Sequence, residues 1–480
     1  PDPSIVRVED DFYMVTSSFA YFPGIPVFHS KDLAHWEQLG HALDRPEQLP
    51  LNAETMSYGI WAPTIRYYNG IYYISATNVD HGLNFIVTAK DPAGEWSEPH
   101  WIKGAYGIDP SLFMDEDGKA YLVMTENIAD EVGEDGRPHF LTTEEPPDYR
   151  ENNILLYEID LSSFSIKGKT DSIWNGSMKG AWSPESPHIY KKNQWYYLLA
   201  AEGGTEHFHS VVVGRSRDIK GPYENYRGNP ILTHRHLGMQ YPIDNVGHGD
   251  LVELKDGSWY MAVLGSRPYG GYHKNMGRET FLVPVEWQDD WPIVSLGSGK
   301  VEWTYPAPNL PIFEVKKEAE RDEFESEVLG DYWNFLGTPE KEIYKIEDSC
   351  LKIRLCAFRM EKTKNDPLWV NVEPIVRCAG FLGRRQRHIN FIADTKLCFS
   401  PIEKQTAGII LLQNDYHSIR MEMALQNGKK IIRVVKGYAS LEASLTYKEN
   451  TESYHREICG SILWEKEEAV LGIEAEGQKI

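Results

Sequence analysis

Four side chains that can donate or accept protons recur at matching places in the first 250 residues: Asp2, Asp109, Glu185 and His248. Two carboxylic acids that face one acetal can hydrolyse it, because one protonates the departing oxygen while the other deprotonates water or attacks the carbon. The separation of the two carboxyls decides between these reactions. A third acid nearby would raise the pKa of the proton donor, because negative charge disfavours ionisation. These residue types are therefore suited to hydrolysis by a pair of acids, with a third that tunes the donor.

The four residues stand at the openings of a repeat that occurs five times. Each copy continues through a short apolar stretch, a turn and an aromatic strand, and reaches a tyrosine eleven or twelve residues after its opening. Repeats of this kind are typical of a β-propeller, whose blades are four-stranded sheets around a central channel. The copies open at Asp2-Pro3-Ser4, Ala62-Pro63-Thr64, Asp109-Pro110-Ser111, Glu185-Ser186-Pro187-His188 and His248-Gly249-Asp250.

The repeat predicts where the reactive side chains lie in space. If each opening starts the innermost strand of a blade, the three acids and His248 all face the channel at one end of a five-bladed propeller. Trp61 precedes Ala62 just as Glu185 precedes Ser186, so an aromatic side chain is expected beside the acids.

Each of these residues also has a purely structural interpretation. An isolated Asp-Pro-Ser phrase at a strand edge is most often a turn in which the aspartate bonds to nearby backbone. The recurrence of acids at one place in the repeat favours a site instead. For His248, a buried histidine that orients a neighbour is favoured over a metal ligand. For Trp61, packing of the channel stays open as an alternative to a wall of the site.

The charge of the chain limits its partners. It has 49 Lys and Arg residues against 71 Asp and Glu residues, a net charge of −22. Such a field repels nucleic acids and anionic lipid surfaces, whereas a neutral ligand is easier to accommodate. No run of about 18 apolar residues is present, so no membrane span is predicted. The sequence leaves a homo-oligomer open.

The positions of the cysteines indicate the cellular compartment of the protein. All five lie after residue 349, and no two form a Cys-x-x-Cys pair. This argues against a disulfide framework and against a zinc site, and it predicts a reduced, cytoplasmic protein. The sequence begins inside the first repeat, so any signal peptide would precede it and secretion stays open.

Two segments mark the end of the repeats. A proline-rich stretch at Tyr305–Pro311 is followed by the charged run Glu314–Glu327. Proline interrupts strand pairing and charge keeps a segment solvated, so we predict a linker at 306–320 between a propeller at 1–305 and a second domain at 321–480. Alternating strands and an Asn-Gly turn indicate that the second domain is a β-sandwich. Because it stops directly after a strand-like run, we expect it to be truncated at its C-terminal end.

Longer blocks surround the repeat openings and continue into the second domain. In the first part they are Asp2–Val8, Ser17–Phe19, Phe22–Gly24, Gly59–Arg66, Gly107–Ser111, Glu185–Tyr190, Ala201–Thr205, Gly247–Leu251 and Gly277–Phe281. In the second they are Arg321–Phe324, Trp333–Leu336, Leu382–Gln386, Ala407–Ile409 and Gln413–Asn414. Together these blocks resemble glycoside hydrolase family 43, and in particular its branch of β-xylosidases and α-L-arabinofuranosidases with a C-terminal sandwich. The resemblance implies an all-β chain, with a five-bladed β-propeller followed by a concanavalin-like β-sandwich.

The resemblance also implies roles for the acids. Asp2 would be the general base that activates water in an inverting hydrolysis, and Glu185 would be the general acid. Asp109 would keep the pKa of Glu185 high and orient it. The family commonly has a glycine where this chain has Ser186, so the acid is slightly more crowded here.

Further residues are implied as walls of the sugar site, and Arg278 would donate hydrogen bonds to sugar hydroxyls. These substrate-binding residues are Phe19, Trp61, His248 and Arg278. No cofactor or metal is expected. Some relatives hold a divalent cation beside the equivalent histidine, so a calcium ion near His248 is the less favoured alternative.

The resulting hypothesis is an exo-β-1,4-xylosidase that releases xylose from xylo-oligosaccharides. An α-L-arabinofuranosidase, alone or as a second activity, is the alternative, because xylopyranose and arabinofuranose present similar hydroxyls. A retaining, invertase-like mechanism is disfavoured, because Ser4 follows Asp2-Pro3 and no cysteine precedes Cys350. A non-catalytic glycan-binding propeller is the remote alternative, since binding alone needs no pair of acids.

Overall fold

The computed structural model is all-β, and none of the residues that it describes lies in a helix, so no helix among them could span a membrane. The structure describes residues 1–49, 51, 56–126, 131–132, 138–139, 153–178, 181–238, 240–339, 343–356, 380–414, 417–439 and 454–480. Contacts divide the chain into two compact units. The first comprises Pro1–Leu51, Ser57–Pro268 and Gly277–Arg321, and the second comprises Asn52–Met56, Tyr269–Met276 and Asp322–Ile480.

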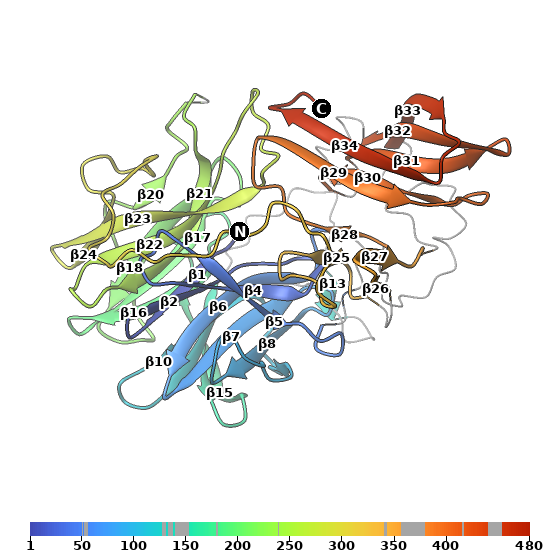
Figure 1. Cartoon of the computed structure of the whole chain (residues 1–480). Helices are drawn as coiled ribbons and strands as arrows, with labels where there is room; N and C mark the ends of the chain where they lie inside the picture. The colour runs from blue at the N-terminus through green and yellow to red at the C-terminus, as the bar shows by residue number, and fades with distance from the viewer. Residues whose placement is uncertain are drawn as a thin grey trace. The chain divides into compact units, whose positions relative to one another are not determined.

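The first unit contains five antiparallel sheets that follow one another along the chain, from dark blue to yellow in Figure 1. The first two blades consist of β1 (Ser4–Val8), β2 (Asp11–Val15), β4 (Gly24–Ser30) and β5 (Glu37–Leu43), then β6 (Ile60–Tyr68), β7 (Ile71–Asn78), β8 (Leu83–Ala89) and β9 (His100–Trp101). The third consists of β10 (Ile108–Met114), β11 (Ala120–Thr125), β14 (Ile154–Asp160) and β15 (Ser165–Trp174). This confirms the predicted propeller.

The fourth blade has an additional short strand, because two strands pair with β18. It consists of β16 (Glu185–Lys192), β17 (Trp195–Glu202), β18 (Ser210–Ser216), β19 (Glu224–Asn225) and β20 (Leu232–Thr233). The fifth consists of β21 (Asp244–Glu253), β22 (Trp259–Ser266), β23 (Arg278–Gln288) and β24 (Trp291–Val294). The remaining short strands of this region are β3 (Tyr21–Phe22), β12 (Glu131–Val132) and β13 (Pro138–His139).

The apolar core lies between neighbouring blades, because each sheet buries both faces against the next. Tyr73 and Ile86 of the second blade pack with Leu112 and Leu122 of the third. The ring closes where Ile5 and Phe12 of the first blade meet Val252 and Ala262 of the fifth. Leu310, in the predicted linker at 306–320, packs against the same closing cluster. Phe313 donates its backbone N–H to Asp32 at 2.8 Å.

The second unit contains two sheets that pack face to face, as in a sandwich. One sheet is β29 (Asn390–Cys398) with β34 (Glu468–Glu476), and the other is β30 (Thr406–Leu412), β31 (Ser418–Gln426), β32 (Lys429–Ala439) and β33 (Tyr454–Leu463). Its smaller strands are β25 (Asn334–Leu336), β26 (Tyr344–Glu347), β27 (Cys350–Ile353) and β28 (Leu382–Gly383). Met423 and Leu471 form the buried centre with Ile432 and Ala469.

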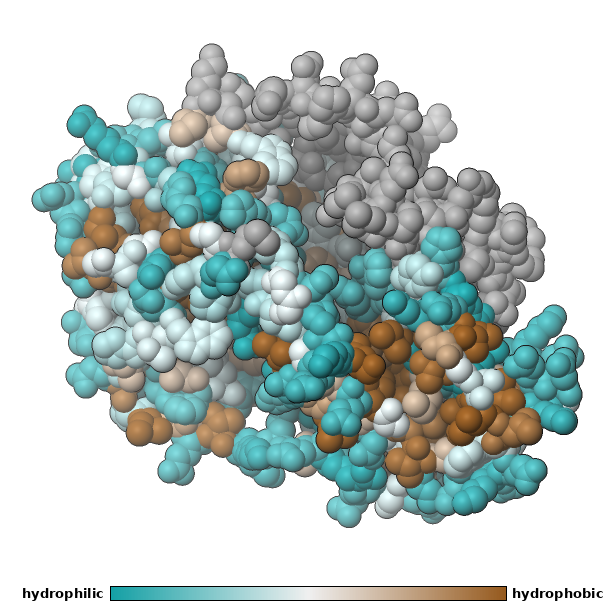
Figure 2. Space-filling view, turned by 90° about the horizontal axis from the view of Figure 1, so that it is seen from above, coloured by the Kyte–Doolittle hydropathy of each residue, from teal (hydrophilic) through white to brown (hydrophobic). Residues whose placement is uncertain are grey.

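Local sequence explains the central hairpin of the sandwich. Asn427 and Gly428 join β31 to β32, both with positive φ, as a two-residue hairpin turn requires. Apolar side chains also gather on the surface of this unit, as Figure 2 shows, and Ile392, Ile462 and Val470 are exposed. Among the described residues Cys350, Cys398 and Cys459 are free thiols, whereas Cys378 lies outside the described residues.

Candidate active site

The five inner strands share one backbone irregularity at the repeat opening. In the second to fifth blades the pairing with the second strand shifts by one residue, as between Glu185 and His188 opposite Ala201 and Leu199. Such a bulge leaves one extra residue and redirects its side chain. The residue at this place has positive φ in all five blades, including the first, where it precedes β1: Asp2 (56°), Ala62 (40°), Asp109 (56°), Ser186 (55°) and His248 (49°).

This register refines the prediction that the acids occupy one place in the repeat. Ser186, not Glu185, is the structural counterpart of Asp2 and Asp109. Glu185 stands one residue earlier, at the position that Trp61 occupies in the second blade. The general acid proposed from the resemblance therefore reaches the site from a different position on its strand than the other two acids do.

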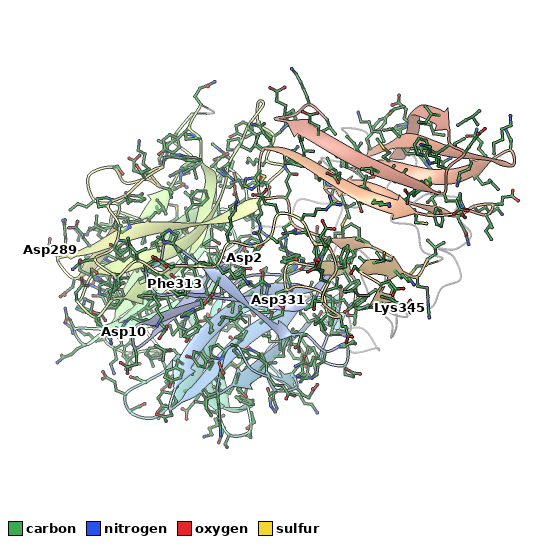
Figure 3. All side chains as sticks on the ribbon, viewed as in Figure 1. Asp2, Asp10, Asp289, Phe313, Asp331 and Lys345 are labelled. Carbon is green, nitrogen blue, oxygen red and sulfur yellow. The ribbon has the colours of Figure 1, made fainter. Side chains whose placement is uncertain are left out.

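Asp2 is buried and accepts hydrogen bonds from two side chains. Arg278 Nη1 donates to Asp2 Oδ1 at 2.9 Å, and Ser17 Oγ donates to Oδ2 at 2.5 Å. Ser17 is itself fixed, because the Ala62 N–H donates to its Oγ at 2.8 Å. Burial alone would raise the pKa of the Asp2 carboxyl, but the Arg278 charge and the Ser17 hydrogen bond outweigh it and hold the pKa well below its usual range. Asp2, labelled in Figure 3, is therefore a carboxylate.

The pKa values of Glu185 and Asp109 are raised and not lowered. Burial raises the pKa of Glu185 first, and the negative charges of Asp109 and Asp2 raise it further. Burial and the charge of Asp2 likewise raise the pKa of Asp109. Asp109 Oδ2 accepts the Ser186 N–H at 3.0 Å, which ties it to the residue next to Glu185. We name Asp2, Asp109 and Glu185 the acid cluster.

The predicted wall residues adjoin this cluster. Arg278 lies with its guanidinium carbon 5.5 Å from the centre of the Phe19 ring. Phe19 pairs with Ile60, the neighbour of Trp61, and the Trp61 indole donates to the Ser57 carbonyl at 2.8 Å. The structure thus gathers Phe19, Trp61 and Arg278 at one end of the first, second and fifth blades.

His248, on the inner strand of the fifth blade, lies beside Asp2. Its Nδ1 lies 3.8 Å from Asp2 Oδ1, and burial lowers the pKa of its imidazole to about 4. His248 is therefore neutral at neutral pH and acts on Asp2 as a polar neighbour and not as a counter-ion. In the described part of the chain no group of three or more His, Cys, Asp or Glu side chains is arranged to hold a metal ion.

A second group of polar residues, which sequence reasoning did not identify, lies two residues further along the inner strands. Asp250 forms the centre: Arg66 donates to both of its oxygens, at 2.9 and 3.2 Å, and Ser4 Oγ donates at 2.6 Å. Tyr190 donates its hydroxyl to Asp250 as well. We name Ser4, Arg66, Ser111, His188, Tyr190 and Asp250 the axial network.

The axial network joins all five inner strands. Arg66 of β6 donates to His188 Nδ1 of β16 at 3.0 Å, and His188 Nδ1 lies 3.0 Å from Ser111 Oγ of β10. The repeat contained a signal for it, because the residue two positions after the one with positive φ is polar and buried in every blade. These residues are Ser4, Thr64, Ser111, His188 and Asp250.

Comparison with known proteins finds a matching family model for each of the two units. Residues 1–292 match the family model described as glycosyl hydrolases family 43, and residues 321–470 match the one described as the beta xylosidase C-terminal concanavalin A-like domain. A protein of Butyrivibrio fibrisolvens named xylosidase/arabinosidase is 42% identical over 448 residues, 91% of this chain and 81% of that protein. The non-reducing end alpha-L-arabinofuranosidase BoGH43B of Bacteroides ovatus is 38% identical over 459 residues, 94% of this chain and 78% of that protein.

Solved structures agree with this assignment. The xylan beta-1,4-xylosidase from Bacillus halodurans superposes with a TM-score of 0.83 at 30% identity, and the Bacteroides ovatus GH43B structure does so with 0.82 at 34% identity. Each match covers 99% of this chain and 85% of the other chain. With its propeller and its concanavalin A-like domain, the chain belongs to glycosyl hydrolase family 43 and is a glycosidase of the xylosidase/arabinosidase type.

Proposed function

We propose that the protein is an exo-β-1,4-xylosidase that inverts the anomeric configuration, with Glu185 as general acid and Asp2 as general base. The observation that carries this proposal is the contrast within the acid cluster. Arg278 and Ser17 hold Asp2 ionised, whereas burial and two neighbouring acids favour the protonated form of Glu185. One ionised and one protonated carboxyl in the same site are the two reactants that acetal hydrolysis requires.

In the proposed reaction Glu185 gives its proton to the glycosidic oxygen as the bond to the anomeric carbon breaks. Asp2 accepts a proton from a water molecule that attacks the same carbon from the opposite face. Asp109 fixes the Ser186 backbone beside Glu185 and adds the negative charge that keeps Glu185 protonated. Arg278 contacts both Asp2 and the Phe19 ring, so it can orient a sugar hydroxyl near the base. These steps use only side chains of this chain and water.

The names of similar proteins support xylosidase activity but also favour a second candidate. The Bacillus halodurans structure is titled a xylan beta-1,4-xylosidase, and the Butyrivibrio fibrisolvens relative is named for both activities. The Bacteroides ovatus relative is named an alpha-L-arabinofuranosidase. We therefore propose α-L-arabinofuranosidase activity as the alternative or as a second activity of the same site.

Hydrolysis of xylobiose followed by proton NMR tests reaction, substrate and stereochemistry together. We expect α-xylose to appear first, since attack from the opposite face inverts the β-linkage. Retained configuration would contradict Asp2 as a base, and binding of xylobiose without turnover would favour a glycan-binding propeller. The ratio of kcat/KM for 4-nitrophenyl β-xylopyranoside and 4-nitrophenyl α-L-arabinofuranoside decides between the two activities.

A further inference from the structure

Trp182 is a large apolar side chain that remains exposed at the end of the fourth blade, just before the strand that carries Glu185. It stands three residues before Glu185 in the sequence, and 61% of it is accessible to solvent. Single exposed apolar residues are common on protein surfaces and need no explanation by themselves. Trp182 differs because its backbone and its ring are both fixed by the strand end that adjoins Glu185.

Two glycines hold Trp182 in place. The Gly203 N–H donates to the Trp182 carbonyl at 2.8 Å. Gly204 lies so close to the indole that a methyl group on its Cα would come within 2.9 Å of the ring. A larger residue at Gly204 would therefore displace the ring. The glycine pair leaves room for the indole to rest on the backbone with much of its surface open to solvent.

The segment that precedes Trp182 is anchored as well. Glu202 is buried at the end of β17, and its carboxylate accepts the Ser177 N–H at 2.5 Å and the Ser177 hydroxyl at 2.7 Å. After Trp182, the Thr125 hydroxyl donates to the Pro184 carbonyl at 3.3 Å. Trp182 is thus positioned by contacts on both sides, which lowers the entropy lost when a ligand binds to it.

The location of this residue relative to Glu185 is set by strand pairing. Glu185 pairs with Ala201, and Gly203 and Gly204 follow directly after the end of that strand, β17. Trp182 therefore lies at the end of the fourth blade that carries Glu185. Phe208, also exposed (60%), lies at the same end of the blade, because its backbone packs against Gly203.

We propose that Trp182 forms a binding site for the departing sugar, stacking its indole on the C–H face of the pyranose ring that receives the proton from Glu185. A general acid stands beside the leaving group, so an aromatic surface on the acid's own strand end lies on the leaving-group side of the bond. Sugar rings have apolar C–H faces that suit such a surface, and Phe208 would extend it. The ligand class is a neutral pyranose of a xylo-oligosaccharide, and this inference rests on the proposed function.

Two substrates with the same xylosyl group but different leaving groups test this proposal. Xylobiose has a sugar that can occupy the Trp182 site, whereas β-xylosyl fluoride releases only fluoride. We expect Trp182→Ala to lower kcat/KM for xylobiose by about fivefold, mostly through KM, and to leave kcat/KM for the fluoride unchanged. Trp182→Phe should recover part of the loss, because a smaller ring still stacks.

Activity on the fluoride also reports whether each variant is folded. Trp101→Ala, at an exposed indole on the outermost strand β9, is the matched control and should change neither substrate. Equal kcat/KM of Trp182→Ala and wild type for xylobiose would overturn the leaving-group site, as would an equal loss on both substrates. Failure of the wild-type protein to hydrolyse xylobiose would instead overturn the proposed function.

Discussion

The acid cluster comes from three of the five blades whose inner strands form the axial network, yet the pKa of the buried carboxyl is lowered in the network and raised for two of the three acids in the cluster. In the axial network Asp250 is fully buried, and a bidentate Arg66, Ser4 and Tyr190 donate to it. In the acid cluster Arg278 bonds to Asp2, while Glu185 and Asp109 lie in the field of other acids. A buried acid with cationic and hydroxyl partners stays ionised and joins strands, whereas one that faces other acids retains its proton and can give it away.

Asp2→Asn should distinguish the catalytic role of the acid cluster from the structural role of the axial network most clearly. The amide cannot accept a proton from water, so kcat should fall by roughly 10³- to 10⁴-fold for every leaving group. Steady-state kinetics with xylobiose and with 4-nitrophenyl β-xylopyranoside measures the loss. Asp10→Asn, at an exposed position of the same blade labelled in Figure 3, is the control and should retain wild-type activity. A fall of less than tenfold would remove Asp2 from the role of base.

Arg66→Met should damage the fold more than the chemistry. It leaves the Asp250 carboxylate buried without its cation, which costs roughly 3–5 kcal/mol in the free energy of unfolding. Urea denaturation followed by tryptophan fluorescence measures this loss. The double variant Arg66→Met/Asp250→Leu should recover part of it, because no buried charge remains. If Arg66→Met has the unfolding free energy of wild type but its kcat falls by more than tenfold, the axial network takes part in the reaction and is not a purely structural group.

Glu185→Gln should depend on the leaving group. Glutamine cannot donate a proton to the departing oxygen, so kcat for xylobiose should fall by roughly 10²- to 10³-fold. A nitrophenolate departs without protonation, so the loss with 4-nitrophenyl β-xylopyranoside should be clearly smaller. The two substrates are compared in the same buffer series. An equal loss on both would assign Glu185 a role other than that of general acid.

Asp109→Asn has the smallest predicted effect, a displacement of the pH profile. Activity requires protonated Glu185, so kcat/KM is lost as pH rises through the raised pKa of that group. Removing the Asp109 charge lowers this pKa, and the alkaline limb should move to lower pH by about one unit. The asparagine Oδ1 can still accept the Ser186 N–H, so the backbone stays in place. An alkaline limb at its original pH would show that Asp109 does not tune Glu185.

The sequence predicted the propeller, the sandwich and the gathering of Asp2, Asp109, Glu185 and Arg278, because five copies of one phrase fix the blades. The sequence prediction aligned Glu185 with Asp2, although Ser186 is the true counterpart of Asp2. The period-two pattern of a strand does not show where a bulge inserts an extra residue, so the offset of one residue was not recognised. The axial network was missed although its residues are in the same phrases, because spacing does not reveal that Arg66 reaches across to Asp250. Trp182 lies outside the repeat, so no counterpart in other blades drew attention to it.

The backbone conformation at each repeat opening does not depend on the chemistry of the side chain there. The same left-handed backbone conformation is adopted by Asp2, Ala62, Asp109, Ser186 and His248, an acid, a methyl, an acid, a hydroxyl and an imidazole. This conformation is therefore imposed by the blade, and the side chain at the position can differ without changing the conformation. The five positions therefore share one backbone geometry, and the side chain at each of them, not the backbone, determines whether it serves as an acid or as a wall of the site.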